Sequence, residues 1–199
     1  ALTAFHDNRI EEAYIHLKNT LAAEPDSLPA KLLFADVLLA KKFYKEAELE
    51  LFSALELGAD VNLVVKPLTE VLLRRGQFST LLSVFDDYAL NTQSKYHYLL
   101  AQANAQIGLD DDDGALITLQ MMSERYPNDI EVRLGLVSVF ITKGELNKAE
   151  QELVLLEKDA GNNEKVLRFF GTLALEKGNA GKALRYFEQA HELAQENVM

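Results

Sequence analysis

The sequence contains no cysteine and no tryptophan, and glycine and proline are scarce. The absence of cysteine excludes disulfides, thiolate nucleophiles, zinc ribbons and iron–sulfur clusters held by cysteine. Ten glycines and four prolines make up 14 of 199 residues, about 7%, compared with roughly 12% in average proteins. Because few residues interrupt regular structure and Leu, Ala and Glu are abundant, the composition predicts long helices.

Basic residues are also too few to balance the acidic ones. The chain has 20 Lys and Arg against 31 Asp and Glu, a formal net charge of −11, which argues against a nucleic-acid partner. No apolar run approaches the ~18–20 residues of a membrane-spanning helix, so we expect no membrane insertion by this segment. The residues from Ala1 to Phe5 lack the features of a signal peptide, but a leader can be removed by processing, so the compartment stays open.

Motifs for catalysis and for metal binding are missing as well. The sequence has no His-Glu-x-x-His, Gly-x-Ser-x-Gly or Gly-x-x-x-x-Gly-Lys motif, so we expect no enzyme, no cofactor and no metal. The acidic run Asp110–Asp113 before Gly114 does not fit a calcium loop, because Leu109 and Gln120 would occupy positions that require carboxylates. We interpret the run as the capped, acidic start of a helix near Gly114.

A 34-residue repeat organises the whole chain. Steps of 34 from Ala13 reach small or apolar residues each time, and the positions four residues later are all large and apolar. Spacings of four and seven residues define one face of a helix, so each copy should contain a helix that buries this face. The two sets of positions are Ala13, Ala47, Leu81, Ala115, Ala149 and Ala183, then Leu17, Leu51, Phe85, Leu119, Leu153 and Phe187.

A second signal precedes each of these helices. Five residues before the first set of positions, Gly76, Gly144 and Gly178 can end a preceding helix in a left-handed turn. Three residues before the set, a mostly apolar residue can seat the following helix. The unit is therefore helix, tight turn, helix and loop. In the fourth copy the glycine is Gly108, two residues early, which predicts a lengthened turn over 109–113 and a shift of phase by two residues.

This pattern resembles the tetratricopeptide repeat, and the best match runs from Arg168 through Gly171, Gly178 and Ala183 to Ala190. The tryptophan of that family is absent throughout. The resemblance implies an all-α, right-handed α-solenoid of antiparallel helix pairs with about five and a half copies. We expect one solenoid over 1–199 that is a piece of a longer protein, with units at 1–27 (partial), 28–61, 62–95, 96–129, 130–163 and 164–199.

Three longer phrases, at 16–21, 54–60 and 67–78, resemble the tetratricopeptide lipoproteins that accompany bacterial exopolysaccharide and PEP-CTERM protein-sorting systems. This resemblance implies an envelope or periplasmic protein that takes part in assembly without catalysis. A cytoplasmic location is the alternative.

The tetratricopeptide resemblance also implies a concave groove lined by the first helix of each unit. Lys66, Glu70 and Arg74 form a ladder of alternating charge at i, i+4 and i+8, which either binds a partner or only stabilises its helix. The phase shift expected from Gly108 turns a further set of residues in the fourth copy inward. The candidate groove residues are Asp36, Lys66, Glu70, Arg74, Tyr98, Gln102, Gln106, Lys165, Arg168, Thr172 and Glu176.

The sequence therefore predicts a non-catalytic scaffold that binds a protein or peptide partner in this groove, within a bacterial envelope, secretion or exopolysaccharide-associated assembly. The alternative is a structural module that forms a homodimer through exposed apolar ends of the solenoid.

Overall fold

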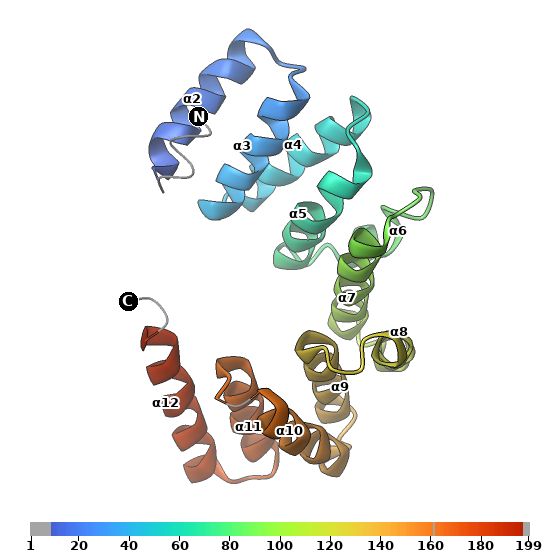
Figure 1. Ribbon diagram of the computed structural model, residues 1–199, viewed down its shortest axis with the longest axis vertical. Helices are drawn as coiled ribbons and strands as arrows, with labels where there is room; N and C mark the ends of the chain where they lie inside the picture. Colours follow the sequence, from blue (N-terminus) through green and yellow to red (C-terminus); the bar gives the residue numbers. More distant parts are fainter. Residues whose placement is uncertain (1–8, 161, 197–199) are drawn as a thin grey trace. The chain divides into compact units, whose positions relative to one another are not determined.

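The computed structural model describes residues 9–160 and 162–196, and within these ranges the chain forms eleven helices and no strand (Figure 1). Consecutive helices pack as pairs, for example α3 with α4, α9 with α10 and α11 with α12. The all-α architecture of helix pairs is confirmed. The helices are α2 (Ile10–Ala23), α3 (Leu28–Ala40), α4 (Tyr44–Glu56), α5 (Val61–Arg74), α6 (Phe78–Ser83), α7 (Thr92–Gly108), α8 (Asp112–Arg125), α9 (Ile130–Thr142), α10 (Leu146–Ala160), α11 (Glu164–Glu176) and α12 (Ala180–Glu196).

The chain forms two compact units, Ala1–Gly108 and Leu109–Met199. We call them unit 1 and unit 2 and describe each by itself. Unit 1 contains α2–α7 and unit 2 contains α8–α12. The single solenoid over 1–199, with its six predicted repeat boundaries, stays a prediction.

The second helix of each pair keeps the 34-residue period. These helices begin 34 residues apart, at the positions where the repeat predicts a residue that seats the helix, namely Ile10, Tyr44, Phe78, Asp112, Leu146 and Ala180. The residues three positions further on, five alanines and one leucine, are at most 1% exposed, so the face of each helix that carries them is buried. These residues are Ala13, Ala47, Leu81, Ala115, Ala149 and Ala183.

The turn within each pair has the same length in five copies, because three residues separate the two helices each time. Its middle residue has a positive φ in every copy, including Lys42 and Asp110, both at 60°. The prediction of a lengthened turn in the fourth copy is therefore wrong. Asp110 adopts the left-handed conformation itself, which aspartate tolerates better than most residues, so α7 runs through Gly108 and no shift of phase follows.

The acidic run is a helix cap, as predicted. Asp111 is the N-cap of α8, and its carboxylate accepts a hydrogen bond from the Gly114 N–H at 3.0 Å. The helix begins at Asp112, two residues before the predicted position. Asp113 in the first turn pairs with Lys143, so the charge of this run serves the fold.

The basic residue that directly follows the first helix of a pair joins that helix to the one before it. This residue is Lys or Arg in four copies, where it also lies at a helix C-terminus and so interacts favourably with the helix dipole. The ion pairs are Lys41 with Glu11, Arg75 with Glu48, Lys143 with Asp113 and Lys177 with Glu150.

The third copy departs most from the repeat. Its second helix, α6, has only six residues, and α7 begins at Thr92, four residues before the predicted unit start. Phe85 lies beyond the end of α6 and is still only 2% exposed, with its ring 5.4 Å from the ring of Tyr98. The apolar side chain is buried although the helix that should carry it has ended.

Candidate functional site

Helix α5 carries three charged side chains on its exposed face. Asp60 caps the helix by accepting a hydrogen bond from the Asn62 N–H at 2.9 Å. The opposite face is anchored in the core by fully buried apolar residues, namely Val64, Val65, Leu68, Val71 and Leu72. This burial fixes the rotation of α5, so Lys66, Glu70 and Arg74 point away from the core, one turn apart.

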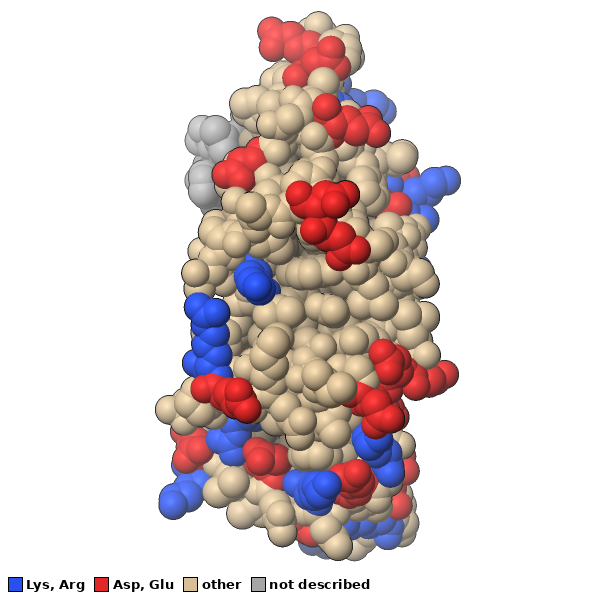
Figure 2. Space-filling view, turned by 90° about the vertical axis from the view of Figure 1, so that its right-hand side faces the viewer, with Lys and Arg blue, Asp and Glu red and all other residues tan. Residues whose placement is uncertain are grey.

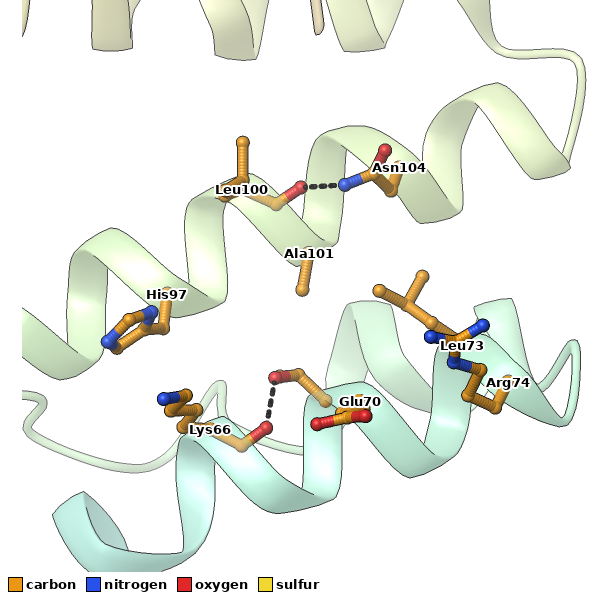
Figure 3. Close-up of a pocket in the computed structure, with 9 residues that line it drawn as sticks. Lys66, Glu70, Leu73, Arg74, His97, Leu100, Ala101 and Asn104 are labelled. Atoms are coloured by element: carbon orange, nitrogen blue, oxygen red, sulfur yellow. Dashed lines mark hydrogen bonds between the residues drawn. The ribbon is translucent and has the colours of Figure 1, made fainter. Parts of the chain in front are cut away.

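These charged side chains line a pocket of about 600 Å³ between α5 and α7 of unit 1 (Figure 3). Lys66 lies opposite His97, and apolar side chains occupy the space between the polar ends. The sequence-predicted ladder is thus brought together with α7, and the structure gives it the shape of a groove. The lining residues are Lys66, Thr69, Glu70, Leu73, Arg74, His97, Leu100, Ala101 and Asn104.

The charges of this pocket are not used within the fold. Among the residues that the structure describes, no ion pair or hydrogen bond engages the ammonium of Lys66, the carboxylate of Glu70 or the guanidinium of Arg74. All three residues are exposed. The alternating ladder therefore does not act through internal ion pairs, and its three charged groups are available to a ligand.

Lys66 couples electrostatically to groups on the helices to either side. Desolvation lowers the pKa of His97 on α7, and the charge of Lys66 lowers it further. Desolvation raises the pKa of Asp36 on α3, and Lys66 opposes that shift. Asp36, Lys66 and His97 therefore share one electrostatic environment across α3, α5 and α7. The place of Asp36 in the groove stays a prediction.

Tyr98 does not line this pocket, and its predicted place in the groove needs correction. The Tyr98 hydroxyl donates a hydrogen bond to the Leu82 carbonyl oxygen at 3.0 Å, so the side chain faces α6. Burial, and to a lesser degree the charge of Asp86, raises the pKa of Tyr98. The predicted orientation rested on the phase shift that the structure does not have.

Gln102 and Gln106, predicted on the same phase, are not among the lining residues either. The residues of α7 that do line the pocket are His97, Leu100, Ala101 and Asn104. In the tetratricopeptide family, positions 2, 5 and 9 of a unit are among those that line the groove. In a unit that starts at residue 96, with no shift of phase, these positions are His97, Leu100 and Asn104. The sequence therefore allowed the correct prediction, and the early Gly108 led away from it.

The four predicted residues of unit 2 lie on α11, and the side chains of three of them have partners within the fold. Lys165 pairs with Glu131 of α9, and the Arg168 Nε lies 2.8 Å from a carboxylate oxygen of Glu164, one turn earlier. The Thr172 hydroxyl donates to the Arg168 carbonyl oxygen at 3.1 Å. Glu176 is exposed, and among the described residues no ion pair or hydrogen bond engages its carboxylate. Helix α11 therefore offers a ligand less free charge than α5 does.

Charged side chains also lie outside this pocket. On the face drawn in Figure 2, acidic and basic side chains lie interspersed, with wide uncharged areas between them. Among the described residues, no group of three or more His, Asp or Glu side chains could hold a metal ion. None of the helices in 9–160 and 162–196 is both long and apolar enough to cross a membrane.

Comparison with known proteins identifies the fold. No family model matches the chain, and no curated protein sequence matches it. Solved structures do match. A tetratricopeptide repeat protein from Parabacteroides merdae is 12% identical with a TM-score of 0.76, over 95% of this chain and 74% of that one.

Two further structures are similar. Pseudomonas aeruginosa pilF is 19% identical with a TM-score of 0.66, over 96% of this chain and 87% of that one. YrrB, described as a tetratricopeptide repeat protein with an unusual peptide-binding site, is 16% identical with a TM-score of 0.54, over 88% and 91%. At these identities the likeness concerns the fold, and the fold of this chain is that of a tetratricopeptide repeat solenoid.

Proposed function

We propose that the protein is a non-catalytic scaffold that binds a segment of a partner protein in the pocket between α5 and α7. The observation that carries this proposal is the set of three charged side chains, Lys66, Glu70 and Arg74, that converge on one pocket without internal partners. Charged groups left free in a concave site give specificity and a faster association rate to a complementary ligand. The peptide-binding site described for YrrB supports a peptide as the kind of ligand.

The test uses peptides selected from a random library on the full chain. We expect Lys66→Glu with Arg74→Glu to weaken the selected peptides about 100-fold, since two favourable charge contacts become repulsive. The matched control is Lys165→Glu with Arg168→Glu in unit 2, which should change the affinity less than about twofold. Fluorescence anisotropy measures affinity, and circular dichroism checks the fold. Failure to select any peptide, or equal losses in both variants, would overturn the proposal.

The setting that we propose is an assembly in the bacterial envelope, associated with secretion or exopolysaccharide export. Its support is the resemblance of 16–21, 54–60 and 67–78 to the PEP-CTERM and exopolysaccharide lipoproteins. Fractionation of the source cells with an antibody against this chain tests it. Recovery in the cytoplasmic fraction alone would contradict it.

A second proposal is self-assembly through exposed apolar side chains. Ile15 on α2 is 56% exposed and Leu184 on α12 is 59% exposed, and apolar surface of this kind can be buried between two copies. Light scattering over a range of concentrations would detect dimers, and Ile15→Asp with Leu184→Asp should abolish them. A chain that stays monomeric at the highest concentration refutes self-assembly and leaves the groove proposal unaffected.

A further inference from the structure

The charges on α5 have a fixed order and spacing. Lys66, Glu70 and Arg74 follow one another at intervals of four residues, which is about 6 Å per step along a helix. The groove therefore presents positive, negative and positive charge over about 12 Å. A ligand that matches all three groups carries acidic, basic and acidic side chains in the same order.

The surroundings give the two positive ends different chemistry. Lys66 lies next to His97, whose imidazole can donate a second hydrogen bond to an acidic group (Figure 3). Arg74 lies near Asn104 and Leu73 in the same pocket. The Asn104 side-chain N–H donates to the Leu100 carbonyl oxygen at 2.9 Å, which fixes the amide in place. The Lys66 end thus combines a cation with an imidazole, whereas the amide N–H of Asn104 is engaged within α7.

The apolar part of the pocket lies between these ends. Ala101 points from α7 toward α5 (Figure 3), and Leu73 and Leu100 also line the pocket. Apolar atoms of the ligand can cover this surface while its charged groups reach α5. The pocket therefore favours side chains with aliphatic stems, such as Glu, Lys and Arg.

The spacing of the charges on α5 matches the spacing of side chains in an extended ligand. In an extended strand, alternate side chains share one face and lie roughly 6.6–6.8 Å apart, close to the spacing on α5. A helix would match as well, with charges at every fourth residue. The selection experiment distinguishes the two, because an extended ligand carries the charges at every second residue and a helix carries them at every fourth.

We propose that the groove of unit 1 recognises an extended peptide segment with the pattern acidic-x-basic-x-acidic, in which the outer acidic residues pair with Lys66 and Arg74 and the central basic residue pairs with Glu70. This inference rests on the proposed function, since it names the partner of the same pocket. The carboxylate of Glu70 between the two cations disfavours a uniformly acidic segment and a run of phosphates.

The experiment reads the pattern directly. Peptides of twelve random residues are selected on the wild-type chain and counter-selected on the Lys66→Glu, Arg74→Glu variant. We expect enrichment of acidic residues at positions i and i+4 and of Lys or Arg at i+2. Binders that depend on the groove but lack this order, or that carry it at i, i+4 and i+8, overturn the inference while the proposed function stands.

A change of specificity provides the second readout. Glu70→Lys should weaken the acidic-basic-acidic peptide about 10-fold and strengthen the same peptide with a central Glu by a similar factor, because the repulsive and attractive pairs exchange. Glu70→Gln, the neutral control, should lie between the two. If Glu70→Lys binds both peptides as the wild type does, the assignment of Glu70 is wrong. If no peptide binds the wild-type chain, the proposed function itself fails.

Discussion

Units 1 and 2 place a row of charged and polar side chains on equivalent helices, α5 and α11, yet only α11 pairs its cations within the fold. Arg168 stands at the repeat position of Lys66, 102 residues later, and it has Glu164 one turn earlier as its partner. The residue one turn before Lys66 is Asn62, which cannot form an ion pair. The residue four positions earlier, Glu164 or Asn62, therefore determines whether the cation has a partner on its own helix.

Helices α5 and α11 also differ in how they pack against the helices that follow them, α6 and α12. The equivalent of Thr69 on α5 is Gly171 on α11, and both are buried. A Cβ atom at Gly171 would lie 2.6 Å from the ring of Phe187 on α12. In unit 1 the equivalent Phe85 lies beyond the end of the short α6, and α5 has room for a threonine. The shortening of α6 and the larger side chain on α5 thus occur in the same repeat.

The largest expected effect tests this packing difference. Gly171→Ala should destabilise the protein by about 1–3 kcal/mol, because the new methyl group overpacks the contact with Phe187. Urea denaturation followed by circular dichroism measures the change. The control is Gly181→Ala on α12, where an added Cβ meets nothing within 4 Å, and it should be neutral or slightly stabilising. Equal effects of the two changes would show that the contact is not tight.

The next prediction gives Lys66 an ion-pair partner one turn earlier, as Arg168 has. Asn62→Glu supplies Lys66 with a partner at i, i+4, so we expect about 0.2–0.5 kcal/mol of added helix stability and a two- to fivefold loss of peptide affinity. Asn62→Gln is the control, because it removes the contacts of Asn62 with Asp60 and Asn91 without adding charge. Isothermal titration with a selected peptide measures the affinity. An equal loss in the control would assign the effect to those contacts.

The smallest expected effects concern the free energy of unfolding and its dependence on pH. One carboxylate in each unit contributes to it, and the two contributions have opposite signs. Lys143 holds the pKa of Asp113 below its ordinary value of 3.8, so this pair stabilises unit 2 above pH 3.8, and the stabilisation is lost as the pH falls through the lowered pKa. In unit 1, desolvation raises the pKa of Asp36 above 3.8, so its ionised form costs stability at neutral pH, and this cost disappears below pH 3.8.

The two asparagine variants should therefore act in opposite directions. At pH 7, Asp113→Asn should lower the free energy of unfolding and Asp36→Asn should raise it, and both differences should shrink as the pH falls below 3.8. Denaturation at each pH measures them. The same sign for both variants at pH 7 would contradict the opposed environments of the two carboxylates.

Much of the fold could be predicted from the repeat, since the period of 34 located the start of every second helix and its buried small residue. The prediction failed where it inferred a long-range shift from one residue. Gly108 looked like a displaced turn residue, but the turn needs a left-handed residue at position 110, and Asp110 can supply it. The error moved the expected groove residues of α7 from His97, Leu100 and Asn104 to Tyr98, Gln102 and Gln106.

The scarcity of glycine, proline and cysteine, together with the repeat, determined by itself that this protein is a helical solenoid, because helix spacing and the burial of small residues are set by local sequence. Which of its charges pair between helices was decided only by the tertiary structure. Lys165 on α11 pairs with Glu131 on α9, whereas among the described residues no ion pair from another helix engages Lys66 or Arg74. A pairing energy of a few tenths of a kcal/mol is too small to shape the fold, and it is large enough to decide which surface can bind.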